Sequence, residues 1–232
     1  MKETLRLDRL LVKKGLVQSR QRAQALILAG KVAVDGEKST KAGTRIPETA
    51  HIEVRGNDNP YVGRGGLKLE AALQAFNLRV KGHRCLDAGA STGGFTDCLL
   101  QHGAVHVVAV DVGYGQLHWR LRSDPRVHVM ERTNVRYMEP TAIPAPFDMI
   151  CLDLSFISLK KVVPNLLQFM KPSGNMICLI KPQFEVQRDL VGKRGVVRDA
   201  AMRDRVLEEL TQAFYTMKLN KVGVIPSPIL GP

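Results

Sequence analysis

The sequence has few cysteines and few aromatic residues, and it contains no long hydrophobic run. Its four cysteines, at positions 85, 98, 151 and 178, form no C-x-x-C pair, so we expect buried thiols in a reducing compartment and no metal site. Aromatic residues make up only 5% of the chain, which argues against extensive base stacking as a mode of nucleic-acid binding. The longest apolar run, near residues 175–180, has the size of a strand, and the first residues lack the apolar core of a signal peptide. These absences predict a cytoplasmic protein that does not contact membranes.

Basic residues outnumber acidic ones by a wide margin. The 232-residue chain has 34 lysines and arginines against 22 aspartates and glutamates, which gives a net charge of +12. Such an excess is typical of proteins that bind a polyanion. The apolar fraction of 44% is sufficient for a packed core. The length suits one α/β domain with a small additional module.

Residues 1–57 are predicted to form that small module. A helix within residues 5–16 and a second one capped by Ser19 precede a hairpin sheet with Asp35-Gly36 at its turn. Basic side chains gather on the two helices, which favours a nucleic-acid surface; the alternative is an ordinary solvated face. The candidate RNA-binding residues are Arg6, Arg9, Lys13, Lys14, Arg20, Arg22 and Lys31, with Arg64 in the connection that follows.

Residues 67–232 are predicted to form the α/β domain, after a linker at residues 58–66. From Arg84 onward, strand-sized apolar runs alternate with helical patterns. This alternation predicts a parallel, doubly wound sheet with helices on both faces. We expect strands at 84–87, 106–110, 127–130, 147–152, 175–180 and 221–225, and helices at 94–101, 116–122, 159–169 and 199–216.

A glycine-rich segment, residues 87–96, follows the first of these strands and opens a helix. Its glycines allow a tight turn and a close approach of the backbone to a ligand, and the helix offers free N–H groups. The dinucleotide pattern G-x-G-x-x-G is not met, because position 91 is serine. The pattern D-x-G-x-x-x-G-G is closer to the S-adenosylmethionine loop of class I methyltransferases. The alternative is a glycine-rich connection in an ordinary α/β domain.

Four polar residues stand where strands of the sheet are predicted to end: Asp87, Asp111, Asp153 and Lys181. In doubly wound sheets, ligands bind at the carboxyl ends of the strands, and an acid after the second strand suits a ribose diol. A lysine after an apolar strand is unusual, although it could be a long side chain that reaches solvent. Asp153 could equally be the N-cap of a helix, and Lys68 by itself would be a surface lysine.

Five segments together resemble the TlyA family. That family pairs an N-terminal S4-like RNA-binding domain of α+β type with an FtsJ-like methyltransferase domain, whose sheet is of the class I, Rossmann-like type. Its members often carry the name haemolysin. The resemblance covers essentially the whole chain, and it implies methylation of cytidine 2′-hydroxyls in ribosomal RNA with S-adenosyl-L-methionine. The segments are residues 61–69, 87–96, 111–117, 153–158 and 181–185.

The resemblance also implies roles for individual residues. FtsJ-like enzymes use a Lys-Asp-Lys-Glu tetrad, and its first three members fall on Lys68, Asp153 and Lys181. We expect the glutamate and a closing strand to lie beyond Pro232. Lys181 either accepts the proton of the ribose hydroxyl or stays charged and polarises it, while Asp153 and Lys68 orient it. The implied cofactor-binding residues are Asp87, Gly89, Ser91, Gly93, Gly94, Phe95, Asp111, Asn134 and Asp153, with Asp111 on the ribose and Asn134 at the adenine edge.

Two other classes of function remain open at this level. A membrane-lytic protein would need an amphipathic or spanning segment, and the sequence offers neither. The second class is a non-catalytic RNA-binding factor in ribosome assembly, which stays open because we expect the tetrad glutamate to lie beyond Pro232. Methylation of a base is less consistent with the sequence, which has neither an Asn-Pro-Pro-Tyr-type motif nor a cysteine at a strand end. The expected partners are ribosomal RNA or ribosomal subunits; the oligomeric state stays open.

Overall fold

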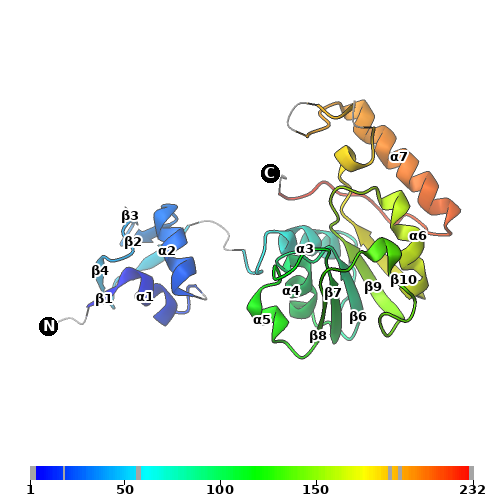
Figure 1. Ribbon diagram of the computed structural model, residues 1–232. Coiled ribbons are helices and arrows are strands. Elements are labelled where there is room, and N and C mark those ends of the chain that lie inside the picture. Colours follow the sequence, from blue (N-terminus) through cyan, green and yellow to red (C-terminus); the bar gives the residue numbers. More distant parts are fainter. Residues whose placement is uncertain (1–3, 18, 56–58, 188–189, 193–194, 230–232) are drawn as a thin grey trace. The chain divides into compact units, whose positions relative to one another are not determined.

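The computed structural model describes residues 4–17, 19–55, 59–187, 190–192 and 195–229 (Figure 1). The chain divides into two compact units, Met1–Asp58 and Asn59–Pro232. Each has its own hydrophobic core, and each is described by itself.

The first unit combines two helices with short strands. Strands β2, β3 and β5 form an antiparallel sheet in the order β3-β2-β5, and β1 pairs with β4. The Ser19 hydroxyl accepts a hydrogen bond of 3.2 Å from the Arg22 N–H and caps the second helix. Asp35 and Gly36, with φ of 51° and 88°, make the turn between β2 and β3. The elements are β1 (Thr4–Arg6), α1 (Leu7–Lys13), α2 (Arg20–Leu28), β2 (Val32–Val34), β3 (Glu37–Ser39), β4 (Arg45–Pro47) and β5 (Ile52–Val54).

The second unit is built on a parallel sheet of five strands in the order β10-β9-β6-β7-β8. The predicted fold class, a doubly wound parallel sheet accompanied by a small α+β unit, is confirmed. The strands are β6 (Arg84–Ala88), β7 (His106–Val110), β8 (Val127–Met130), β9 (Phe147–Leu152) and β10 (Met170–Cys178). The helices are α3 (Gly65–Ala75), α4 (Gly94–Gln101), α5 (Trp119–Arg122), α6 (Val163–Leu166) and α7 (Ala200–Thr216), with 3₁₀ turns η1 (Val135–Tyr137), η2 (Leu159–Lys161), η3 (Leu167–Phe169) and η4 (Pro182–Phe184).

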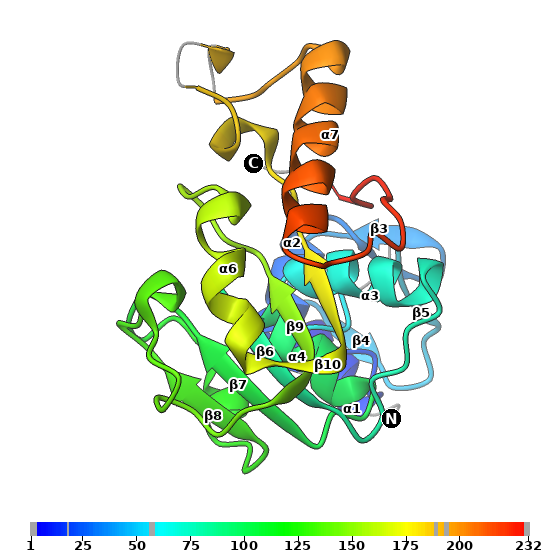
Figure 2. The ribbon, with the colours of Figure 1, turned by 90° about the vertical axis from the view of Figure 1, so that its right-hand side faces the viewer.

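Hydrophobic layers cover both faces of this sheet. Successive side chains of a strand point to opposite faces, and in β6 Cys85 packs with the layer of α3 and α4, whereas Leu86 packs with the layer of α6 and α7. Figure 2 shows α6 in front of the strands. Burial on both faces explains why these strands read as nearly continuous apolar runs.

The strand order reverses direction between β6 and β9. The chain runs from β6 outward through β7 and β8, then returns to the other side of β6 with β9 and β10. The Asp153 N–H donates to the Ala88 carbonyl at 3.1 Å, so the ends of β6 and β9 lie side by side. A ligand crevice is expected at such a switch point, outside the carboxyl ends of the strands.

Four element predictions need correction. The strand expected at 175–180 is β10, which begins at Met170, before an irregularity in its pairing with β9, and ends at Cys178. Residues 221–225 are not a strand: Gly223 packs so closely on Phe76 that a Cβ would lie 2.6 Å from the ring, and this stretch pairs with no described strand. The helix expected at 159–169 is broken into η2, α6 and η3, since Pro164 removes a backbone donor. The helix expected at 116–122 begins only at Trp119, where the His118 imidazole caps it.

Residues 59–66, expected to lie in the linker, pack as part of the second unit. Tyr61 is buried, and the Val62 N–H donates to the Asp97 carboxylate at 2.8 Å. This anchoring fixes the start of α3, which carries Lys68. Among the described residues, no helix combines the length and the apolar character needed to cross a bilayer.

Candidate functional site

The glycine-rich segment turns sharply between β6 and α4. Gly89 has φ of 89°, and a Cβ there would lie 2.7 Å from the Asp153 carbonyl oxygen. Gly93 has φ of 96°, and a Cβ there would collide with Leu117 and Leu121. Both positions therefore require glycine, as the sequence pattern indicated. The turn keeps the backbone of this segment close to the ends of β6 and β9.

The two residues that begin α4 are buried. Gly94 opens the helix, and the Phe95 side chain is part of the core that covers one face of the sheet. Only backbone groups of Phe95 are therefore placed to meet a ligand, and the N–H groups of a first helical turn lack partners within the helix.

Asp111 connects the glycine-rich segment to the end of β7. One carboxylate oxygen accepts from the Ser91 N–H at 2.8 Å, and the other accepts from the Gly113 N–H at 2.7 Å. Ser91 holds φ of 48°, and its side chain is exposed. A carboxylate has about four acceptor positions, so Asp111 keeps acceptor capacity for a hydroxyl-bearing ligand while it orders the loop.

Asp87 lies near the end of β6, where the glycine-rich segment begins, and is fully buried. One oxygen accepts from the Thr96 hydroxyl at 2.6 Å, whereas the other, Oδ1, has no hydrogen-bond partner. Burial disfavours the charged form and raises the pKa of Asp87 to about 7, and the nearby acids Asp153 and Asp111 act in the same direction. A buried carboxyl oxygen without a partner at a strand end is an unusual feature that a cationic or donor-bearing ligand would satisfy.

The structure brings Lys68, Asp153 and Lys181 together. The Lys181 Nζ lies 2.6 Å from Asp153 Oδ1, and the Lys68 Nζ lies 3.3 Å from Asp153 Oδ2. The side chain of Lys181 is 20% exposed, and those of Lys68 and Asp153 are each 19% exposed. One carboxylate therefore holds two amines at the edge of a partly shielded site. Such a site can orient a hydroxyl and remove its proton.

Asn134 lies farther along the same edge, after β8. Its side-chain oxygen accepts from the Arg136 N–H at 3.0 Å and caps the 3₁₀ turn η1. The residue is exposed, so its amide NH₂ remains available to a ligand.

Sequence reasoning gave no role to Ser155 and Glu185. The Lys181 Nζ donates to the Ser155 hydroxyl at 2.9 Å. Glu185 accepts from the Ser158 hydroxyl at 2.6 Å and from the Leu159 N–H at 2.8 Å. Both residues lie inside the segments that carry the family resemblance, which is the signal that could have pointed to them.

Two aromatic rings lie beside these polar groups. Phe156 is 91% exposed, has φ of 64°, and its ring centroid is 5.1 Å from that of Phe184. An exposed phenylalanine in a left-handed conformation is rare. The rings provide an apolar surface next to Ser155 and Lys181.

The cysteines do not provide a nucleophile. Burial raises the pKa of Cys85, Cys98 and Cys178 to about 12 and also raises that of Cys151. The thiolate, which is the reactive form, is therefore scarce at neutral pH.

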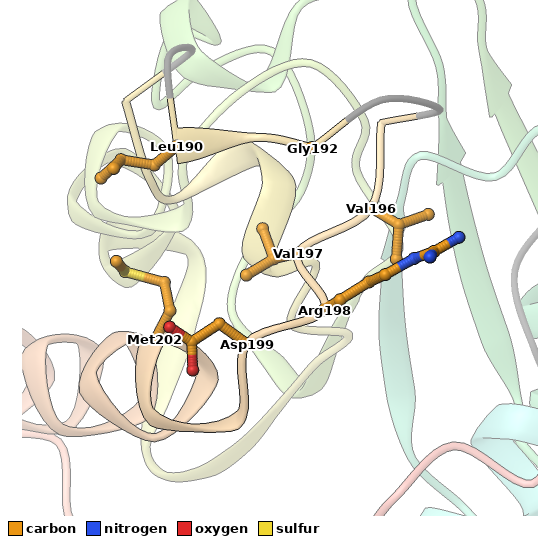
Figure 3. A pocket seen from close by; sticks show the side chains of 7 residues that line it. All are labelled: Leu190, Gly192, Val196, Val197, Arg198, Asp199 and Met202. Carbon is orange, nitrogen blue, oxygen red and sulfur yellow. The ribbon is translucent and has the colours of Figure 1, made fainter.

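A cavity of about 660 Å³ lies at the start of α7 (Figure 3). It is separate from the strand-end site, by which we mean Lys68, Asp153, Lys181 and the residues around them at the carboxyl ends of β6, β7 and β9. None of the side chains expected to bind cofactor, substrate or RNA lines it. Its lining residues are Leu190, Gly192, Val196, Val197, Arg198, Asp199 and Met202.

The candidate RNA-binding residues fall into different environments. Arg6 and Arg20 both pair with the buried Asp8, at 3.0 and 2.8 Å. Lys13 pairs with Glu48 at 2.7 Å, and Lys14 donates to the Ala50 carbonyl at 2.9 Å. Other candidates are exposed side chains: Arg9, Arg22 and Lys31 in the first unit and Arg64 at the start of α3 in the second.

Comparisons with known proteins agree with this architecture. The FtsJ-like methyltransferase family matches residues 61–232, and the S4 domain matches residues 5–52. The 16S/23S rRNA (cytidine-2′-O)-methyltransferase TlyA of Mycobacterium tuberculosis is 48% identical over 100% of this chain and 87% of its own length. Hemolysin A of Brachyspira hyodysenteriae is 42% identical over 98% of this chain and 95% of its own length. A solved structure from Streptococcus thermophilus, of a protein that carries the name hemolysin, is 42% identical, covers 91% of this chain and 78% of that one, and superposes with a TM-score of 0.68.

Proposed function

The chain belongs to the TlyA family of FtsJ-like methyltransferases, and on that premise we propose that it methylates ribose 2′-hydroxyls, those of cytidine, in ribosomal RNA with S-adenosylmethionine as donor. The observation that carries the proposal is the arrangement of two lysine amines, those of Lys68 and Lys181, around the Asp153 carboxylate at the switch point of the sheet. A ribose hydroxyl is a weak acid, and an amine held in place is a suitable group to take its proton.

The residues at the strand ends fit S-adenosylmethionine. Gly89 and Gly93 allow the tight turn between β6 and α4, and the buried Oδ1 of Asp87 at the end of β6 has no partner within the protein. A cofactor with an ammonium group suits a buried carboxyl oxygen that has no donor within the protein. We assign Asp111 to the ribose hydroxyls and Asn134 to the adenine edge, because both lie along the same edge of the sheet. When bound, this cofactor supplies an electrophilic methyl group.

The chain's own residues position and deprotonate the acceptor. Lys181 in its neutral form accepts the proton of the 2′-hydroxyl. Asp153 holds Lys181 through one oxygen and Lys68 through the other, so that neither amine turns away from the site. Because this scheme asks for no covalent intermediate with the protein, orientation of the reacting groups is the main contribution to the rate.

Ribosomal RNA is the acceptor that the other features favour. The S4 domain and the net charge of +12 suit a polyanion. The exposed ring of Phe156, with the partly buried ring of Phe184 beside it, suits a nucleotide that has left its stack, because enzymes that act on nucleotides commonly extrude their target and hold it against aromatic side chains. The name of the M. tuberculosis relative specifies a cytidine 2′-oxygen, and we extend that substrate to this chain.

Transfer of a tritiated methyl group to purified ribosomal subunits tests the proposal. The modified nucleotide should map to a cytidine, and the phosphodiester that follows it should resist alkaline hydrolysis because the 2′-oxygen is blocked. A methyl group on the base would contradict the proposal. Binding of the cofactor without any transfer would favour a non-catalytic RNA-binding factor, and leakage of liposomes would favour the membrane-lytic alternative.

The cofactor assignment has its own test in Asp111→Ala. Affinity for S-adenosylmethionine should weaken by about 1–3 kcal/mol, the usual effect when buried partners are left unpaired. Calorimetry measures this directly. The variant also loses the contacts to Ser91 and Gly113, so Asp111→Asn, which keeps one acceptor oxygen, is the comparison variant and should bind more tightly than Asp111→Ala. Equal affinity of wild type and Asp111→Ala would remove this residue from the site.

A further inference from the structure

The amine of Lys181 has two oxygen partners within the protein. Its Nζ lies 2.6 Å from Asp153 Oδ1 and 2.9 Å from the Ser155 hydroxyl oxygen. The two partners are only two residues apart, just after β9. Asp153 alone would hold the nitrogen in place but would leave it able to rotate about the Cε–Nζ bond. A second acceptor fixes that rotation.

The number of partners matters because of the chemistry of an amine. An ammonium group has three N–H donors and no acceptor. The neutral amine has two N–H groups and one lone pair. If Asp153 and Ser155 receive both N–H groups of the neutral amine, the remaining direction carries the lone pair, which is the orbital that accepts a proton.

Ser155 is held against Lys181 by a second connection between the same two segments. Glu185, four residues after Lys181, accepts from the Ser158 hydroxyl at 2.6 Å and from the Leu159 N–H at 2.8 Å. Between Ser155 and Ser158 the chain turns at Phe156, with φ of 64°. The segment 155–159 is therefore tied at both ends to the segment 181–185, which keeps the hydroxyl of Ser155 within reach of the amine.

We propose that Ser155 is a positioning residue that, together with Asp153, occupies both N–H groups of neutral Lys181 and so directs its lone pair toward the acceptor hydroxyl. The inference rests on the proposed function, since it assumes that Lys181 takes the proton of the 2′-hydroxyl. That proton moves from the ribose oxygen to the amine, which becomes an ammonium ion. Ser155 neither gains nor loses a proton in this step.

The test compares wild type with Ser155→Ala and Ser155→Thr in methyl transfer to ribosomal subunits over a range of pH. Ser155→Ala should lower kcat about tenfold, as expected for one lost hydrogen bond, with KM for cofactor and RNA unchanged. The rising limb of the pH profile should move to lower pH by about half a unit, because the ammonium form loses an acceptor. Ser155→Thr keeps the hydroxyl and should restore both values. Ser173→Ala, at an exposed serine in β10, is the matched control.

Each contrary result has a distinct meaning. Full kcat in Ser155→Ala would overturn the inference. So would an increased KM for RNA at unchanged kcat, which would place the hydroxyl on the substrate. A lower kcat with an unmoved pH limb, or a threonine variant as impaired as alanine, would reduce Ser155 to a structural role.

A measurement that does not require turnover separates this inference from the proposed function. Competitive acetylation of lysines followed by mass spectrometry gives the pH dependence of the reactivity of Lys181, with Lys171 as internal reference. The midpoint for Lys181 should move to lower pH in Ser155→Ala, and an unmoved midpoint would overturn the inference. A wild-type chain that transfers no methyl group to RNA would instead remove the proposed function.

Discussion

Among the described residues, each of the two units buries one carboxylate completely, and the surroundings of the two carboxylates are opposite in character. Asp8 in the first unit accepts from Arg6 at 3.1 and 3.0 Å, from Arg20 at 2.8 Å and from Gln24 at 2.9 Å. Asp87 in the second unit has donors from Thr96 alone, and its Oδ1 has no partner. The hydrogen bond from Arg6 is the largest effect that lowers the pKa of Asp8, whereas burial raises the pKa of Asp87.

The difference separates a structural acid from one that is placed for a ligand. A buried carboxylate with charged donors on several sides holds helices together and needs nothing further. A buried carboxyl group with a missing donor costs stability, and such groups gather at functional sites. The comparison also adds a structural role for Arg6 and Arg20. Both are predicted to bind RNA, and both pair with Asp8 in the structure.

The largest effect is expected from a substitution at the strand-end site, which should lower catalytic activity strongly and change the stability of the fold little. Lys181→Met should lower kcat by about 10²–10⁴-fold, the usual contribution of a general base, while the melting temperature changes little, since Lys181 is at the rim of the fold. Lys181→Arg should not restore activity, because arginine keeps its proton at any working pH. Methyl-transfer kinetics and thermal unfolding measure the two properties.

The matched control for Lys181 is a lysine of the same sheet. Lys171 in β10 pairs with Asp148 at 2.5 Å, outside the proposed site. Lys171→Met should retain activity. Near-full activity in Lys181→Arg would contradict the role of Lys181 as a base.

The second effect is a pH dependence that differs in sign between the two buried acids. The pKa of Asp87 is raised from 3.8 to about 7. As the pH rises from about 4 to 7, the unfolded chain releases this proton and the folded chain keeps it, so the folded state loses stability. Asp87→Asn has no proton to release, and it should gain roughly 2–4 kcal/mol over wild type between pH 4 and pH 8. Denaturant unfolding at several pH values measures the gain.

Asp8 should behave in the opposite way. Its pKa is lowered from the ordinary value of 3.8, so its contribution to stability is fully present above that value and is lost as the pH falls below it. If the free energy of unfolding of Asp87→Asn differed from that of wild type by the same amount at pH 4 and pH 8, the raised pKa of Asp87, and with it the contrast with Asp8, would be contradicted.

Much of the second unit could be predicted from local sequence. The need for glycine at positions 89 and 93 and the alternation of strands with helices are local properties, and β6, β7, β8 and β9 lie where they were expected. Residues 221–225 have the composition of a strand but no partner in the described part of the chain. Strand pairing depends on distant residues, which a local pattern does not contain.

Contacts across long distances in sequence explain the remaining gaps. Lys68 reaches Asp153 across 85 positions, and only the family resemblance suggested that pairing. Asp8 and Arg20 meet because α1 packs on α2, which no charge count can reveal. Ser155 and Glu185 acquire their roles because two loops lie side by side after β9 and β10.

The third effect comes from the pairing of Asp8. Arg20→Met removes one charged donor and leaves the buried carboxylate with Arg6 and Gln24. The first unit should lose about 1–3 kcal/mol, the usual cost when a buried acceptor loses a partner. Hydrogen exchange of residues 20–34 measures the stability of that unit within the full chain. A double variant with Asp8→Asn should recover part of the loss, because the carboxylate charge is then absent, and equal protection in Arg20→Met and wild type would show that Arg20 is not needed to satisfy Asp8.

The smallest effect concerns RNA, and the comparison decides which residues to change. Arg6 and Arg20 are poor choices because replacing either one also removes a hydrogen-bond donor from the buried Asp8 and so lowers the stability of the first unit. Arg9 and Lys31 are exposed basic residues of the same unit. Replacing both by glutamine should reduce the dependence of log affinity on log salt by about 0.7–0.9 per lost phosphate contact, since fewer counterions are released. Cofactor affinity should stay unchanged.

The control for this last experiment must have the same loss of charge elsewhere. Arg79 and Lys81 are exposed residues just before β6, at the opposite edge of the sheet from the strand-end site. Arg79→Gln with Lys81→Gln lowers the net charge by the same amount, so a general electrostatic attraction would reduce the salt slope equally in both double variants. A docking surface on the first unit predicts a reduced slope only when Arg9 and Lys31 are replaced. Filter binding to ribosomal RNA between 50 and 200 mM salt, about the range over which counterion release is measured, distinguishes the two outcomes.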